Sequence, residues 1–307
     1  MRPLWRVFFF ALGSTLPALA YSEKLPLWEF GAGVAGLNLP HYRGSDEEKS
    51  YLLPVPYLIY RGERLRLDDR GMRGRIFQTD RVKLDLSLAG GVPVPRDAGG
   101  VRAGMPGLNP TVEFGPSFDI RLMDSDDRKI ALWLRLPVRA VFSVGRDMGH
   151  QGWSFAPYVE YIYRDGHRYP FKLGVSLGPL FADEKYHNYF YEVDRAYATA
   201  VRPEYHPGGG YSGSRVTLTL QKRFGDFWAG VFGRYDMLGG TAFENSPLVR
   251  TNNYHAIGFA VTWIFLKSNR MVEDGTTEDF RAPSRQPIPC PEAATGSPRS
   301  LASTCLE

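Results

Sequence analysis

Segments in which apolar and polar residues alternate constrain the fold of this chain more than any other feature. Residues 81–89 read RVKLDLSLA, with valine and leucines on one face and Arg, Lys, Asp and Ser on the other. The same period of two recurs in residues 111–122 and 129–142, and less regularly in later segments. Alternation with this period indicates β-strands that each have one apolar and one polar face.

The lengths of strands and loops distinguish the two architectures that use such strands. Strands of a soluble sandwich usually run to about five or six residues, whereas a tilted membrane-spanning strand needs about 9–11. Here the long alternating segments match the second case. Short polar turns fall at residues 124–127, 165–167 and 224–226, and long connections fall at residues 39–50, 90–110, 182–213 and 238–253. Short turns at one end and long extracellular loops at the other are typical of an outer-membrane barrel.

We therefore predict an all-β fold, a transmembrane, antiparallel, up-and-down β-barrel of about 12 strands, with 10 or 14 as alternatives. Both ends of the barrel are expected in the periplasm. The strands are expected at residues 28–38, 51–60, 64–69, 72–78, 81–89, 111–122, 129–142, 153–164, 170–181, 214–224, 226–237 and 254–266.

The two ends of the chain have a different character from the barrel. Residues 1–20 combine Arg2 and Arg6 with a short apolar run and a small-x-small site at Ala18 and Ala20, which predicts a cleaved signal peptide. The barrel domain is expected over residues 21–266. Residues 267–307 are rich in Pro, Ser, Thr and Ala, which predicts a disordered periplasmic tail.

The tail contains both cysteines of the chain, Cys290 and Cys305. Because the periplasm is oxidising, these two residues can form a disulfide within the tail. The barrel itself folds without one.

The alternation also assigns faces to individual residues. We expect the apolar face to meet lipid, and it comprises Val82, Leu84, Leu86, Val112, Phe114, Phe118, Leu132 and Leu134. We expect charges of both signs to line the lumen, namely Arg81, Lys83, Asp85, Glu113, Asp119, Arg121, Arg135 and Arg139. Mixed signs favour mutual ion pairing over an ion-selective pore, in which one sign would dominate.

Prolines inside the expected strands conflict with a closed barrel, because proline lacks the N–H that a strand neighbour would accept. We expect each of them at a bulge, at a rim, or where strand pairing fails. They are Pro54, Pro56, Pro116, Pro137, Pro157 and Pro179.

Two motifs resemble those of the MipA/OmpV family of outer-membrane proteins. The first is Tyr-x-Gly-Ser-Asp at Tyr42, Gly44, Ser45 and Asp46, followed by a strand with Pro54 and Pro56. The second comprises Ser246, Pro247, Leu248 and Val249. The likeness extends over about residues 28–265. Neither motif has the residue types of a catalytic signature.

This resemblance implies an outer-membrane β-barrel with a structural or scaffolding role. Family members are described as bridging a murein-degrading lytic transglycosylase to a murein synthase, so these two enzymes are the partners it suggests, alongside outer-membrane lipid. The residues themselves support two alternatives, a small-solute channel or ligand-binding barrel and, less strongly, a lipid-modifying barrel enzyme.

Catalytic, metal and nucleic-acid chemistry have little support in the sequence. There is no Gly-x-Ser-x-Gly elbow, no pair of histidines at metal-ligand spacing, and a formal charge of only +4. We therefore expect no enzyme activity, no cofactor and no nucleic-acid partner. The aromatic residues of the loop at 182–213 are expected to pack as a lid over the barrel mouth or to bind a surface partner.

Overall fold

The computed structural model describes residues 24–62, 65–68, 71–79, 81–96, 99–125, 129–145, 148–165 and 171–273. The expected signal peptide, Cys290, Cys305 and the tail from residue 274 onward lie outside these ranges. The elements in chain order are β1 (Lys24–Pro26), β2 (Trp28–Pro40), β3 (Glu48–Arg61), β4 (Leu65–Asp68), β5 (Gly71–Gln78), β6 (Val82–Gly91), η1 (Gly100–Arg102), β7 (Thr111–Asp124), β8 (Ile130–Ser143), β9 (Gly149–Phe155), β10 (Tyr158–Arg164), β11 (Phe171–Ala182), α1 (Glu184–Tyr191), η2 (Arg195–Tyr197), β12 (Gly210–Phe224), β13 (Phe227–Met237), β14 (Asn253–Lys267) and β15 (Met271–Glu273).

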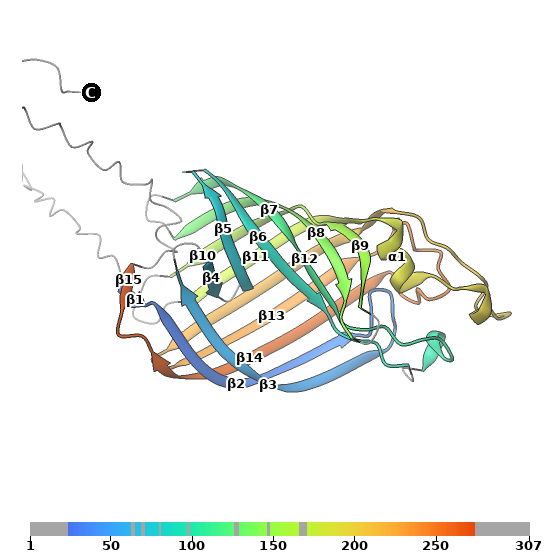
Figure 1. Ribbon diagram of the computed structural model, residues 1–307, viewed down its shortest axis with the longest axis horizontal. Helices are drawn as coiled ribbons and strands as arrows, with labels where there is room; N and C mark the ends of the chain where they lie inside the picture. The colour runs from blue at the N-terminus through green and yellow to red at the C-terminus, as the bar shows by residue number, and fades with distance from the viewer. Residues whose placement is uncertain are drawn as a thin grey trace, which may run out of the picture.

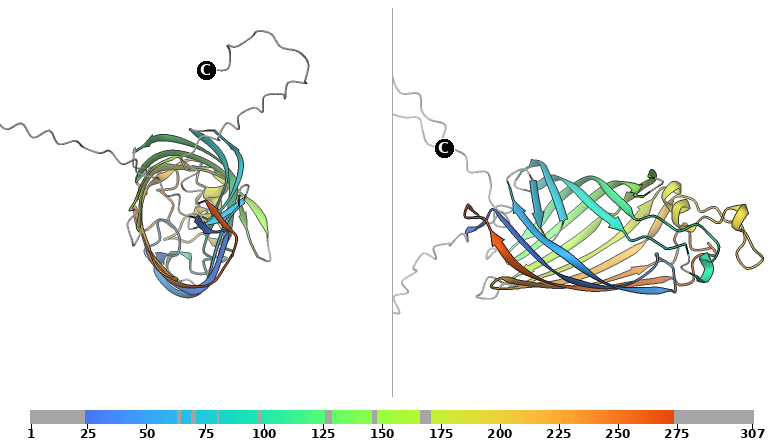
Figure 2. Two further views of the ribbon diagram at one scale, coloured as in Figure 1. Left: turned by 90° about the vertical axis from the view of Figure 1, so that its left-hand side faces the viewer. Right: turned by 60° about the horizontal axis from the view of Figure 1, so that its bottom comes forward.

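Strands β2 to β14 form one antiparallel sheet that closes on itself (Figures 1 and 2). Each strand pairs with the next along the chain except β9, which does not pair with β10, and β14 pairs back with β2. Strands β9 and β10 both lie between β8 and β11, so they occupy a single position in the wall. The predicted up-and-down barrel with about 12 strands is confirmed.

The two faces of the wall differ as the alternation predicts. In β14, Ile257, Phe259 and Val261 are exposed, whereas Ala256 and Thr262 are buried on the opposite face. Exposed large apolar side chains recur on the outer face of neighbouring strands, including Val34, Leu58, Val112, Phe114, Phe118, Leu218, Val231 and Trp263. An apolar exterior of this kind faces lipid in an outer-membrane barrel.

Four of the strand prolines lie along a seam where strand pairing is interrupted. Strand β8 pairs with β10 up to Arg135 and with β9 from Val138, and Pro137 falls between the two stretches. Pro157 separates β9 from β10. Pro116 has no described partner on β8, and Pro179 faces the break between β9 and β10. Since pairing already fails along this seam, the missing N–H groups cost little there.

Pro54 and Pro56 have a different explanation. Both lie on β3, where the described pairing involves β2 alone. On its other side β3 pairs with β4 only at Tyr60 and Arg61. The two prolines therefore belong to an open strand edge, which is where a β-sheet tolerates proline.

A small second sheet lies at the periplasmic end. Strand β1 pairs antiparallel with β15, and both lie beyond the barrel rim (Figure 1). Backbone bonds join this sheet to the wall, from Leu27 N to Arg270 O (2.8 Å) and from Arg61 N to Leu27 O (2.7 Å). The domain boundary expected at residue 266 thus falls just before an ordered stretch, because β14 ends at Lys267 and β15 follows.

The long loops pack together over the opposite, extracellular end. Their shared core joins residues from four loops and the strand ends, namely Tyr42, Val94, Met105, Leu108, Tyr191, Val193, Leu238, Phe243, Leu248, Tyr254 and Ala256. The rings of Tyr191 and Phe243 stack with centroids 3.7 Å apart. We call this assembly the lid. No helix in the described part of the chain is long and apolar enough to cross a membrane.

Candidate functional site

The lumen contains charged groups at three levels along the barrel axis. At the periplasmic level the buried carboxylate of Glu29 accepts at Oε2 from Arg61 Nη2 at 3.0 Å and from Arg223 Nη1 at 3.0 Å. These three residues come from β2, β3 and β12. The carboxylate is therefore fully compensated by two guanidinium groups.

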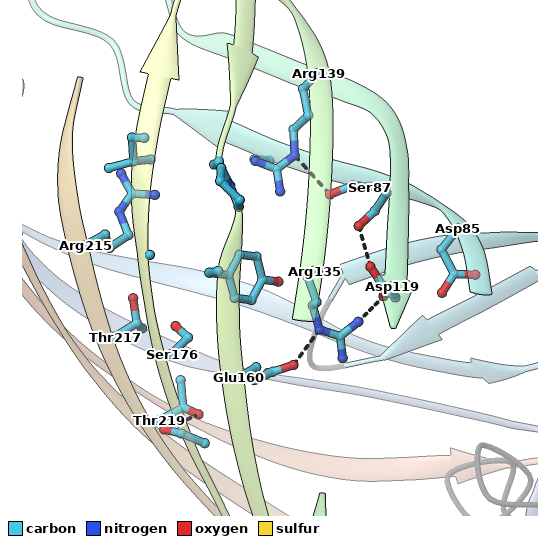
Figure 3. Close-up of a pocket in the computed structure, with 18 of the residues that line it drawn as sticks. Asp85, Ser87, Asp119, Arg135, Arg139, Glu160, Ser176, Arg215, Thr217 and Thr219 are labelled. Atoms are coloured by element: carbon cyan, nitrogen blue, oxygen red, sulfur yellow. Dashed lines mark hydrogen bonds and ion pairs between the residues drawn. The ribbon is translucent and has the colours of Figure 1, made fainter. Parts of the chain in front are cut away.

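At the middle level, Arg135 bridges two carboxylates (Figure 3). Its guanidinium bonds Asp119 and, at 2.6 Å, Glu160 Oε2, and Ser117 Oγ donates to Asp119 Oδ1 at 2.5 Å. These residues lie on adjacent strands in register, since Asp119 faces Arg135 across β7 and β8. The inward-facing ring of Trp133 adds a cation–π contact with Lys83 Nζ at 4.8 Å.

At the extracellular level, a single carboxylate holds three arginines. Asp236 is completely buried, and its oxygens accept hydrogen bonds from Arg215 Nε at 2.9 Å and Arg234 Nη2 at 2.6 Å. Arg43 forms an ion pair with the same carboxylate, with its Nε 2.9 Å from Asp236 Oδ2. Arg43 comes from the loop before β3, whereas Arg215 and Arg234 come from β12 and β13. One negative charge among three positive charges leaves this level with an excess of guanidinium.

The structure distributes the eight expected lumen charges unevenly. Lys83, Asp85, Asp119 and Arg135 are buried inside the barrel. Arg139 donates to Ser87 Oγ at 2.9 Å and lies 3.9 Å from Glu113.

The remaining two charges lie near the periplasmic rim. Arg121 pairs with Asp124 at 3.2 Å at the end of β7. Arg81 is exposed in the turn that precedes β6. Strand β6 begins at Val82, after a turn closed by a bond from Thr79 N to Val82 O, and Arg121 N donates to Arg81 O at 2.8 Å.

Further luminal charges were not anticipated, among them Glu29, Arg43, Arg61, Glu160, Arg215, Arg223, Arg234 and Asp236. Arg43 lies in a loop, and the others lie in strands with an irregular polar face. The alternation of side-chain direction was the sequence signal that could have placed Arg215 and Arg234 on the inward face of their strands. Alternation shows which face of a strand a residue occupies. It does not show that three arginines meet at Asp236, because that depends on how β12 and β13 are aligned with each other.

Two cavities lie inside the barrel among these charges. The first has a volume of ≈ 380 Å³ and is lined by the middle level together with Thr217, Thr219 and the seam residues Pro157 and Pro179 (Figure 3). The second has a volume of ≈ 310 Å³ and lies under the lid. We call the second cavity the upper chamber.

The residues of the two family motifs meet in the lid. Tyr42 donates its hydroxyl to Leu248 O at 2.8 Å, and Ser246 Oγ donates to Tyr191 O at 2.8 Å. Gly44 has a φ of 95°, a backbone conformation that favours glycine, and its carbonyl accepts from Arg250 N at 2.7 Å. Burial of Tyr42 in the lid raises the pKa of its phenol. The geometry gives these residues a structural role in closing the barrel mouth.

A serine and a histidine form the one hydrogen-bonded pair in the lid that resembles a nucleophile and its base. His187 on α1 is fully buried, with Nε2 3.1 Å from Ser212 Oγ and Nδ1 2.7 Å from Gly208 O. Burial lowers the pKa of His187, and the charge of Arg43 lowers it further. A weakly basic imidazole that is fully buried is a poor general base.

Metal binding has no geometric support in the part of the chain that the structure describes. No cluster of three or more His, Cys, Asp or Glu side chains lies close enough to coordinate an ion there. The polar luminal groups are arranged as ion pairs and hydrogen bonds. At the extracellular level the arginines outnumber the carboxylates, and this arrangement suits recognition of an anion.

Comparisons with known proteins match the wall of this barrel. Residues 32–265 match the model of the family described as MltA-interacting protein MipA. Outer membrane protein Omp26La of Vibrio anguillarum is 27% identical over 231 residues, covering 72% of this chain and 80% of that protein. Outer membrane protein OmpV of Vibrio cholerae serotype O1 is 26% identical over 231 residues, with the same coverage.

Solved structures with a similar arrangement are outer-membrane proteins as well. An outer membrane channel from Pseudomonas putida F1 aligns with a TM-score of 0.44 and 13% identity, covering 80% of this chain and 98% of that one. The NanC porin aligns with a TM-score of 0.33 and 10% identity, covering 77% of this chain and 98% of that one.

The family match begins at Ala32, the fifth residue of β2, and ends at Phe265, two residues before the end of β14. It therefore includes part or all of every strand of the wall and both motifs of the lid. The relatives are named as outer membrane proteins, and the apolar exterior suits that location. The chain is accordingly an outer-membrane β-barrel and belongs to the MltA-interacting protein MipA family.

Proposed function

We propose that this barrel is a non-enzymatic scaffold that holds a murein-degrading lytic transglycosylase, together with a murein synthase, at the periplasmic face of the outer membrane. The family description, which names an MltA-interacting protein, supports the first partner. The observation that carries the proposal is the small sheet formed by β1 and β15 at the periplasmic rim.

This sheet has the properties of a docking element for an extended segment. Among the described residues, β1 and β15 pair only with each other, so each leaves one strand edge open. An open edge can accept a further strand from a partner. The sheet is held firmly to the wall, because Arg61 Nη1 donates to Pro26 O at 2.8 Å and Ser268 N donates to Trp28 O at 2.9 Å.

The interior supports a structural role better than a transport or catalytic one. Ion pairs line the lumen at Glu29, Asp119 and Asp236, and the lid packs over the mouth. A lumen that is occupied by mutually paired charges adds rigidity to a membrane anchor. Ser212 and His187 lack a carboxylate partner in their hydrogen bonds and are buried, which supports the absence of turnover.

A binding experiment with purified lytic transglycosylase tests the scaffold. The detergent-solubilised protein should bind the enzyme on a biosensor surface. A chain shortened after Ser268, which lacks β15, should bind at least tenfold more weakly, whereas a chain shortened after Glu273 should bind as the full chain does. Lack of binding by the full chain would contradict the proposal. Loss in both shortened chains would assign the contact to the tail.

Conductance and hydrolysis measurements test the two alternatives. Planar bilayers that contain the purified barrel should show no stepwise conductance, and steady ion flow would favour the small-solute channel. Phospholipid and murein should not be hydrolysed. Turnover that disappears on Ser212→Ala would overturn the non-enzymatic assignment in favour of a lipid-modifying or murein-modifying barrel.

A further inference from the structure

The barrel wall has a window between β3 and β6. Over residues 48–59, β3 pairs within the described chain with β2 alone. Over residues 86–91, β6 likewise pairs with β7 alone, because its pairing with β5 is confined to Lys83–Asp85. The short hairpin of β4 and β5 fills the space between the two strands only at the periplasmic end. In Figure 1, strands β13 and β14 are seen between β3 and β6.

The window lies in the extracellular half of the wall, so it opens toward the outer leaflet. Open strand edges are unfavourable in hydrocarbon, because their N–H and C=O groups have no water to bond. Pro54 and Pro56 reduce this cost by removing two N–H groups from the edge of β3. The remaining edge groups favour an occupant that brings polar atoms as well as an apolar chain.

The inner wall beside the window is apolar, unlike the rest of the lumen. The inward positions of β3 are Tyr51, Leu53, Val55, Tyr57 and Ile59, and those of the paired stretch of β2 include Gly31, Gly33, Ala35 and Leu37. Leu53 is 44% exposed although it faces the lumen. A Cβ at Gly33 would lie 2.0 Å from Val261 O, so this position has no room for a side chain. An acyl chain fits along such a surface.

The upper chamber adjoins β2, the strand that pairs with β3, and the free end of β6. Leu37 and Leu39 line it from β2, and Ala89, Gly90 and Gly91 line it from the free end of β6. Its charged lining consists of Arg43, Arg139, Arg215 and Arg234 against the single carboxylate of Glu113. Asp236 lies behind three of these arginines and neutralises one charge. Four guanidinium groups thus share two carboxylates, an excess that suits a bound anion.

We propose that the upper chamber binds the carboxylate of a long-chain fatty acid, whose acyl chain lies along the inner face of β3 and enters from the outer leaflet through the window between β3 and β6. The volume of ≈ 310 Å³ accommodates a carboxylate with the first part of its chain. The arginine excess selects an anionic head group, and the apolar inner face of β3 selects a long chain. This ligand site is separate from the periplasmic sheet of the scaffold.

Photolabelling of the detergent-solubilised full chain with a diazirine-bearing palmitate tests the site. Labels should map to the inner positions Tyr51, Leu53 and Val55. Unlabelled palmitate should compete, whereas acetate, which lacks the chain, and hexadecanol, which lacks the charge, should not. Labels confined to outward positions such as Leu52 or Leu218 would show a lipid annulus alone and would overturn the proposal.

Two substitutions separate the head-group and chain contributions. Arg234→Gln should reduce competable labelling about tenfold, the size of one charge-assisted hydrogen bond, while the matched change Arg250→Gln at an exposed loop residue should leave it unchanged. Leu53→Gln should also reduce it, and its exposure makes the substitution compatible with folding. Equal labelling in Arg234→Gln and Arg250→Gln would contradict the carboxylate site. If Arg234→Gln does not assemble, unchanged labelling in Leu53→Gln overturns the proposal by itself.

Discussion

Asp236 shows how much a single residue can organise inside this barrel. Its carboxylate joins a loop and two strands, because it forms ion pairs with Arg43, Arg215 and Arg234. No side-chain surface of Asp236 is exposed, so the charges on both sides depend on each other for solvation. Removing one partner from such a group is costly because it leaves buried charge uncompensated.

Substitution of that aspartate is the first prediction. Asp236→Asn keeps the shape but leaves three guanidinium groups without a carboxylate, and it should lower the free energy of unfolding by about 3–5 kcal/mol. Urea unfolding of the barrel in detergent, followed by its heat-dependent gel mobility, measures this. The matched change Asp46→Asn removes an exposed ion pair with Arg250 and should cost no more than about 1 kcal/mol. Equal costs would show that the triad of arginines is not stabilised by Asp236.

The buried His187 predicts a pH dependence of the lid. Its pKa is lowered by burial, so the folded lid binds fewer protons at this site than the unfolded loop does. The stabilisation is therefore complete above the unfolded pKa of about 6.5 and is lost as the pH falls through it. The protection factors of residues 184–191 against hydrogen exchange, which are corrected for the intrinsic pH dependence of amide exchange, should fall between pH 7.5 and pH 5.5. In His187→Gln the protection factors should lose this pH dependence, and an unaltered profile would assign it to another group.

At the scale of elements, the seam of prolines and glycines shapes the wall across β7, β8, β10 and β11. Adjacent strands approach closely where pairing is interrupted. A Cβ at Gly115 would lie 2.1 Å from Val138 O, and one at Gly178 would lie 2.0 Å from Pro157 O. The seam therefore requires residues without side chains beside the prolines, and it lines the middle cavity.

A pair of glycine substitutions tests the seam. Gly115→Ala forces a methyl group against a backbone carbonyl and should destabilise the barrel by about 1–3 kcal/mol. Gly239→Ala lies in a loop with no heavy atom within 4 Å and should change stability little. The same urea and gel-mobility measurements compare the two variants. Similar behaviour would indicate that the strands separate at the seam without cost.

The lipid-facing side of β14 supports a further prediction. Val261 is 45% exposed on the outer face near the middle of the strand, opposite the inward Thr262. Val261→Arg should cost about 2–4 kcal/mol if its position is near the bilayer midplane. Val201→Arg at the 91% exposed loop tip is the control and should be neutral. Folding yield into lipid vesicles reports the difference, and a neutral Val261→Arg would contradict the lipid-facing assignment.

At the scale of the whole molecule, strand β14 completes the wall by pairing with β2. Among the described residues after β14, Met271–Glu273 form the further strand β15, which pairs with β1. Truncation after Glu273 should therefore preserve assembly and stability. Truncation after Ser268 should preserve the wall but release β1. Failure of the shorter chain to insert into membranes would make the β1–β15 sheet part of the folding unit.

The expected disulfide in the tail belongs to the same test. Cys290 and Cys305 lie outside the described residues, and a loop of about fifteen residues closed within an unfolded tail adds little to barrel stability. Replacing both cysteines with serine should leave the unfolding midpoint unchanged. A lower midpoint would show that the tail contacts the barrel.

Local patterns in the sequence determined the architecture of this protein. Alternation over residues 81–89 and 111–122 identified strands and their faces, because side-chain direction repeats every two residues whatever the partner strand. Turn and loop lengths identified the two ends of the barrel. The same two-residue repeat of side-chain direction allowed the sequence to place Asp119 and Arg135 on the luminal face.

Features that depend on pairing between distant segments were decided only by the tertiary structure. The contact of Arg43 with Asp236, the bond between His187 and Ser212, the sheet of β1 with β15 and the window beside β3 all join residues far apart in the chain. Alternation along a strand shows which face a residue occupies. The residues that it contacts on that face depend on the register of the strands and on which strands are neighbours. The prolines of β3 illustrate the limit. The sequence predicts that Pro54 and Pro56 lie at a bulge, at a rim or where strand pairing fails, and only the pairing of β3 with its neighbours shows that they lie on an open strand edge.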